Sequence, residues 1–128
     1  MGKTILVVDD DEPVRKSISI ALKLKGGFDT LEAEDGLIGL EMAKQHHPDL
    51  IISDVVMENL NGFLMLETLK EYPETADIPI IMMTVQAQTD KDWKTGAAVE
   101  YLAKGFTLDE LLGKVYSILK INPPIPKK

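Results

Sequence analysis

Short apolar runs recur five times along the chain, and longer segments of mixed polarity separate them. The runs are rich in Val, Ile and Leu, which is typical of strands that are covered on both faces of a sheet. The second run mixes threonine and charged residues with leucine, so we expect a more exposed strand there. The predicted strands cover residues 4–8, 28–33, 49–53, 78–83 and 99–103.

The intervening segments place apolar residues at intervals of three and four, which predicts helices. Pro13 suits the first turn of the first helix, and Gly26-Gly27 ends it. Thr107 and Glu110 have the spacing of a capping box at the start of the last helix. We expect five helices: from Pro13, from Gly36 to about residue 45, around residues 63–69, around residues 89–95, and from Thr107 to Leu119.

Strands that alternate with helices predict an α/β domain with a parallel five-stranded sheet. Right-handed crossovers place helices on both faces of such a sheet, so we expect a three-layer sandwich. The chain of 128 residues has the usual size of one domain, and we assign that domain to residues 1–121. Residues 122–128 read NPPIPKK and predict a linker stub or free tail, because the prolines do not continue a helix.

The composition argues against several classes of protein. The chain has no cysteine, which excludes disulfides and thiolate sites, and no apolar run approaches the length of a membrane span. We therefore expect a cytoplasmic protein without a membrane segment. The net charge of -7 argues against direct nucleic-acid binding, which needs clustered Lys and Arg.

Residues suited to phosphoryl chemistry follow several of the predicted strands. Asp9 and Asp10 follow the first, Asp54 the third, Thr84 the fourth and Lys104 the fifth. The carboxyl ends of neighbouring parallel strands meet at one edge of a sheet, so these side chains should converge. Acids, a hydroxyl and an ammonium together match a divalent cation and a phosphorylated aspartate. Taken singly, each has a simpler interpretation, since an Asp pair often forms a solvated turn.

Four segments in this order carry a family resemblance: ILVVDDDEPVR, LIISDVVMENLNG, IIMMT and YLAKGF. Together they resemble the receiver domain (CheY-like) of two-component response regulators, over residues 3–121. The resemblance implies a flavodoxin-like (βα)5 fold with strand order 2-1-3-4-5. It also implies a phosphoprotein that signals and is not an enzyme acting on a separate substrate, apart from self-catalysed phosphotransfer and autodephosphorylation.

The resemblance also implies a metal site. Asp54 is the expected phosphoacceptor, and the expected ion is Mg²⁺, for which Mn²⁺ can substitute. Asp10 would bind this ion directly, Asp9 through a water molecule, and Asp54 and the backbone carbonyl of Val56 would complete the protein ligands. Such a set suits Mg²⁺, which prefers hard oxygen ligands and keeps several waters.

The same resemblance assigns the remaining roles. Thr84 and Lys104 match the hydroxyl and ammonium that contact the phosphoryl oxygens, and Tyr101 matches a rotameric aromatic of the switch. The alternative for Tyr101 is an edge-strand aromatic with a packing role. The implied partners are a sensor histidine kinase or histidine phosphotransfer protein and a downstream effector. The effector, or a second copy in a homodimer, would bind the face built by the fourth helix, the fifth strand and the last helix.

Other classes of function remain open. Receivers usually carry proline after the lysine, where this chain has Gly105, and Glu58 and Val85 also depart from the usual pattern. These departures motivate a second hypothesis, a pseudo-receiver that acts by protein binding without phosphorylation. Phosphatases with an aspartate nucleophile resemble a D-x-D pattern, with a second acid two residues after the nucleophile. In this chain Val56 occupies that position after Asp54, so the pattern is incomplete. An FMN carrier would place a phosphate beside the DDDE segment, which would repel it.

Overall fold

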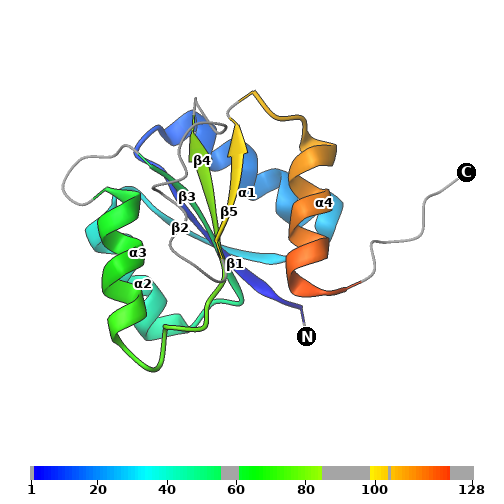
Figure 1. Ribbon diagram of the computed structural model, residues 1–128. Helices are drawn as coiled ribbons and strands as arrows, with labels where there is room; N and C mark the ends of the chain where they lie inside the picture. Colours follow the sequence, from blue (N-terminus) through cyan, green and yellow to red (C-terminus); the bar gives the residue numbers. More distant parts are fainter. Residues whose placement is uncertain (1, 56–60, 85–98, 104, 122–128) are drawn as a thin grey trace, which may run out of the picture.

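The computed structural model describes residues 2–55, 61–84, 99–103 and 105–121 of the chain. All five predicted strands are present, and they form one parallel sheet in the order β2-β1-β3-β4-β5. Figure 1 shows β1 in the interior of this sheet and β5 at its edge. The strands are β1 Thr4–Val8, β2 Asp29–Ala33, β3 Leu50–Asp54, β4 Ile80–Thr84 and β5 Val99–Ala103. Both the parallel sheet and the strand order are therefore as predicted.

Strand boundaries differ slightly from the prediction, for physical reasons. β4 begins at Ile80 and not at residue 78, because Pro79 has no backbone N–H to donate to a ladder. Pro79 still accepts a hydrogen bond from the Ile51 amide at 3.0 Å. Asp49 precedes β3 instead of belonging to it, and its carboxylate accepts a hydrogen bond of 2.8 Å from the Thr4 amide.

Four helices are described: α1 Glu12–Gly26, α2 Gly36–His46, α3 Gly62–Glu71 and α4 Leu108–Leu119. The predicted helix around residues 89–95 and the predicted tail at residues 122–128 lie outside the described residues. The last predicted helix is therefore labelled α4. Its capping box is confirmed, because the Glu110 amide donates to the Thr107 hydroxyl and the Thr107 amide donates to the Glu110 carboxylate.

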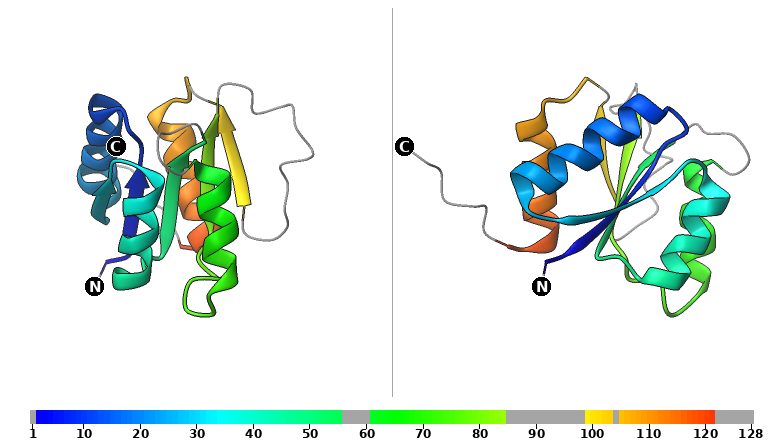
Figure 2. Two further views of the ribbon diagram at one scale, coloured as in Figure 1. Left: turned by 90° about the vertical axis from the view of Figure 1, so that its left-hand side faces the viewer. Right: turned by 180° about the vertical axis from the view of Figure 1, so that it is seen from behind.

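The helices form two layers on opposite faces of the sheet (Figure 2). One buried cluster joins α1 and α4 to strand residues such as Ile5, Val7 and Ile52. The other joins α2 and α3 to the alternating strand residues, among them Leu6, Val8 and Ile51. Successive side chains of a strand point to opposite faces, so each central strand supplies both clusters. The predicted three-layer sandwich is confirmed. Within the described part of the chain, every helix is too short or too polar to cross a membrane.

Candidate functional site

The candidate site lies at the carboxyl ends of β1 and β3. These strands are paired in parallel with Val8 opposite Ser53, so the next residues, Asp9 and Asp54, lie side by side. Carboxylate oxygens of Asp9, Asp10 and Asp54 all lie within 4.8 Å of one another. Asp9 is fully buried, Asp54 is 7% exposed and Asp10 is exposed. The structure therefore brings together the three acids that the strand-end pattern predicted.

Asp9 is held at its amide, its side chain and its carbonyl. Its amide donates to the Ala33 carbonyl of β2 at 3.1 Å. Its carboxylate accepts a hydrogen bond of 2.9 Å from the Asp11 amide. Its carbonyl accepts a hydrogen bond of 2.9 Å from Nη1 of Arg15, on the first turns of α1. Hydrogen bonds within the protein therefore hold the segment that carries the two acids.

Arg15 is a residue that the sequence interpretation missed. While Nη1 binds the Asp9 carbonyl, Nε of the same guanidinium lies 3.0 Å from a carboxylate oxygen of Glu32 on β2. Lys16 lies 3.3 Å from the same oxygen. Burial raises the pKa of Glu32, but hydrogen bonds from Arg15 and Lys16 outweigh it and hold this pKa below its ordinary value of 4.5. A charged Glu32 thus anchors the arginine that contacts the site.

Asp54 is the last residue of β3, and the start of α3 is pressed against it. The Gly62 amide donates to the Val55 carbonyl at 2.9 Å, and the Val55 amide donates to the Met83 carbonyl at 3.2 Å. A Cβ on Gly62 would lie 2.5 Å from the Asp54 carbonyl oxygen, closer than real Cβ atoms approach. Only glycine fits this position without a shift. The sequence interpretation placed the predicted helix around residues 63–69 and gave Gly62 no role, although a glycine at the start of a helix was a possible signal of close approach.

The other predicted site residues are placed less completely. Thr84 ends β4 opposite Ala103 of β5, beside the end of β3, and the structure does not describe its side chain. Val56 and Lys104 lie outside the described residues. Tyr101 lies on β5, opposite Met82 of β4. It is partly buried and packs against the cluster beneath α2 and α3. That packing agrees with the edge-strand interpretation, and the switch role of Tyr101 stays a prediction.

Comparison with known proteins agrees with this geometry. Residues 5–116 match the model of the response regulator receiver domain. This chain belongs to that family. The predicted family and its CheY-like fold are thereby confirmed.

Individual relatives support the assignment. The receiver is 38% identical to the protein PilH of Pseudomonas aeruginosa, over 90% of this chain and 96% of PilH. It is 35% identical to the DNA-binding dual master transcriptional regulator RpaA of Synechocystis, over 96% of this chain. That match covers 52% of RpaA, so the chain spans about half the length of this relative.

Solved structures are similar as well. A putative response regulator from Chloroflexus aurantiacus has a TM-score of 0.82 at 31% identity, covering 94% of this chain and 99% of the other. The chemotaxis protein CheY4 of Vibrio cholerae has a TM-score of 0.81 at 28% identity, covering 92% of this chain and 99% of the other. These matches extend over nearly the whole receiver.

The acid cluster of the receiver has the donor chemistry of a hard divalent cation. Its three carboxylates supply oxygen ligands from two adjacent chain segments, and one of them is fully buried. A cation would relieve the mutual repulsion of these negative groups, which grows as solvent is excluded. The cluster could therefore hold a metal ion.

Gly105 marks a departure from the usual receiver pattern. Its φ is 96°, in the region that favours glycine, whereas a proline ring fixes φ near -65°. The chain after β5 thus follows a path here that proline could not take. The backbone at this position favours glycine, so Gly105 is not a simple replacement for proline.

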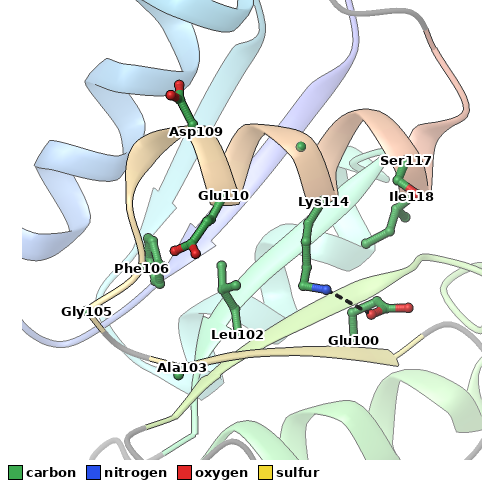
Figure 3. A pocket seen from close by; sticks show the side chains of 11 residues that line it. Glu100, Leu102, Ala103, Gly105, Phe106, Asp109, Glu110, Lys114, Ser117 and Ile118 are labelled. Carbon is green, nitrogen blue, oxygen red and sulfur yellow. Dashed lines mark hydrogen bonds and ion pairs between the residues drawn. The ribbon is translucent and has the colours of Figure 1, made fainter.

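A groove with a volume of about 660 Å³ separates β5 from α4. Figure 3 shows Leu102 and Phe106 beside acidic side chains from both elements, and Lys114 of α4 reaching Glu100 of β5 at 3.4 Å. The acidic residues of the lining are Glu100, Asp109 and Glu110. The groove adjoins Ala103 and Gly105, at the carboxyl end of β5. This surface of the receiver therefore combines apolar area with negative charge.

Proposed function

We propose that this chain is a phosphoacceptor receiver that takes a phosphoryl group onto Asp54 from the phosphohistidine of a sensor histidine kinase or a histidine phosphotransfer protein. One observation carries the proposal: the Asp54 carboxylate lies within 4.8 Å of the Asp9 and Asp10 carboxylates at the strand ends. Membership of the receiver family supports it. Asp54 is the last residue of β3, at the carboxyl edge of the sheet, where the ligand crevice of such sheets lies.

The cation in this proposal is Mg²⁺, with Mn²⁺ able to replace it. Asp10 and Asp54 would bind it directly, Asp9 through water, and the Val56 carbonyl would add a ligand. When bound, the cation supplies positive charge that offsets the negative charge of the incoming phosphoryl group and holds that group in line. Hydrogen bonds to the Asp9 amide, carboxylate and carbonyl would support this arrangement, because they hold the residue that precedes Asp10.

In the proposed transfer, an oxygen of Asp54 attacks phosphorus and forms an acyl phosphate. The P–N bond of the donor breaks, its electron pair stays on the imidazole nitrogen, and that nitrogen takes up a proton from solvent. Lys104 would offset the added charge on the phosphoryl oxygens, and Thr84 would donate a hydrogen bond to them. Hydrolysis of the acyl phosphate by water would return Asp54 to its carboxylate form.

A partner would read the change at the edge of the sheet. In this part of the proposal, Thr84 moves toward the phosphoryl group and Tyr101 follows into the vacated space, which alters the surface that includes β5 and α4. The acidic lining of the groove beside these elements would favour an effector with basic groups. A homodimer through the same surface is part of the proposal and is tested by measuring mass in solution with and without phosphorylation.

The test of phosphoacceptance is direct. Incubation with Mg²⁺ and acetyl phosphate should add one phosphoryl group to the intact protein, as measured by mass spectrometry. Asp54→Asn should remove the adduct. Asp77→Asn, a charge-matched change at an exposed residue away from the site, should keep it. A wild-type protein that stays unmodified while a known receiver in the same tube is phosphorylated would refute the proposal.

The path at Gly105 favours a second candidate, a pseudo-receiver that binds partners without phosphorylation. A φ of 96° after residue 104 implies a backbone unlike that of receivers with proline there. Under this candidate, Asp54→Asn would leave partner affinity unchanged even with Mg²⁺ and acetyl phosphate present. A loss of the phosphorylation-dependent affinity change in that variant would favour the first candidate.

A further inference from the structure

Arg15 occupies a bridging position between three elements. Its Nη1 donates to the Asp9 carbonyl at the end of β1, and its Nε donates to Glu32 on β2. The residue itself belongs to α1, and its side chain is only 11% exposed. A planar guanidinium can make both contacts at once because its donors point in fixed, divergent directions.

The Asp9 carbonyl matters because it belongs to the peptide that joins Asp9 to Asp10. Holding this oxygen fixes the plane of the peptide and therefore the direction in which Asp10 leaves it. Asp10 is exposed, so packing does little to set its orientation. A second hydrogen bond acts next to this peptide, because the Asp11 amide donates to the Asp9 carboxylate.

We propose that Arg15 is a positioning residue for the acid pair: by binding the Asp9 carbonyl while anchored on Glu32, it orients Asp10 for a divalent cation. This inference rests on the proposed function, since it assumes that the acid cluster binds such a cation. Removing a group that orients a metal ligand typically lowers metal affinity about ten- to a hundredfold. Arg15→Met should therefore weaken cation binding about tenfold.

The sign of this effect separates positioning from simple electrostatics. The guanidinium is positively charged and is bonded to the Asp9 carbonyl, so its charge repels a cation held by the acid pair. If Arg15 acted only through this charge, its removal would tighten cation binding. If Arg15 only tied α1 to β2, its removal would lower stability and leave the affinity of the folded protein unchanged. Weaker binding by a folded variant is expected only if the arginine orients the ligands.

The experiment measures Mn²⁺ binding by the electron paramagnetic resonance signal of free Mn²⁺, which requires no phosphorylation. Circular dichroism verifies that each variant is folded. Lys16→Met is the matched control, because it removes a neighbouring positive charge and another contact to Glu32 but leaves the bond to the Asp9 carbonyl. It should change Mn²⁺ affinity less than about twofold, because surface charges in water interact weakly.

Arg15→Lys keeps the charge and most of the stem, and it is the variant to measure if Arg15→Met does not fold. A single ammonium is not expected to span the carbonyl and Glu32 as the guanidinium does, so binding should weaken several-fold. In phosphorylation by acetyl phosphate, both variants should need more Mg²⁺ for half-maximal rate and reach the wild-type rate at saturating Mg²⁺. Wild-type affinity or tighter binding in the folded Arg15 variants would overturn the inference. If the wild-type protein binds no Mn²⁺, the proposed function itself fails.

Discussion

Replacing Gly62 with alanine is expected to destabilise the domain and to displace the backbone of Asp54. The new Cβ would meet the Asp54 carbonyl oxygen at 2.5 Å and the Met82 sulfur at 3.2 Å. Asp54 pairs with Met83 in the sheet, and the Gly62 amide is bonded to the Val55 carbonyl. Neither side of the contact can therefore move without disturbing the ladder or the start of α3.

The magnitude follows from two opposing effects. Added volume in a packed site typically costs about 1–3 kcal/mol, and this contact involves backbone and not the end of a flexible side chain. Alanine regains at most about 1 kcal/mol through its higher helix propensity. With about 2 kcal/mol for the first effect and about 0.5 kcal/mol for the second, the net free energy of unfolding should fall by about 1.5 kcal/mol.

Gly113 in α4 provides a matched control, because a Cβ there would meet no atom within 4 Å. Gly113→Ala should raise the free energy of unfolding by about 0.5–1 kcal/mol. Urea unfolding followed by circular dichroism measures both changes. A Gly62→Ala protein as stable as wild type would refute the close approach of α3 to Asp54, and with it the account of how Asp54 is positioned.

Three further predictions concern charge and hydrogen bonding. In the absence of Mg²⁺, Asp10→Asn should raise the free energy of unfolding by about 1 kcal/mol, because it removes repulsion within the acid cluster. Thermal unfolding should also show that Mg²⁺ stabilises this variant less than wild type. An unchanged response to Mg²⁺ would contradict the proposed site. Because the pKa of Glu32 is lowered in the folded protein, the ionised side chain stabilises the fold at neutral pH. This stabilisation is lost as the pH falls through the folded-state pKa, which lies below 4.5. Urea unfolding should therefore show that Glu32→Gln is less stable than wild type at pH 7 and that the difference shrinks below about pH 4; a constant difference would argue against the ion pairs. Thr75→Val should cost about 1 kcal/mol in the same assay, since the buried Thr75 hydroxyl donates to the Leu69 carbonyl at 2.7 Å, and a neutral result would show that this bond adds nothing.

Sequence reasoning succeeded where a local pattern has one structural meaning. The apolar runs gave all five strands, and the Thr107–Glu110 spacing gave the capping box at the start of α4. The strand-end positions of Asp9 and Asp54 placed them together, because parallel strands end at the same edge. Boundaries moved by one or two residues; β4, for example, begins after Pro79, which has no N–H to donate to the ladder.

What the sequence alone determined is the alternation of elements and the edge at which the acids gather, because hydrophobic period and chain direction are local properties. Tertiary structure decided the contacts that hold those acids in place. Arg15 reaches Glu32 across 17 positions in the chain, and Gly62 touches the Asp54 carbonyl through the packing of α3 on β3. Hydrogen bonds and steric contacts act over a few ångströms, so their partners are known only once separate elements have been brought together.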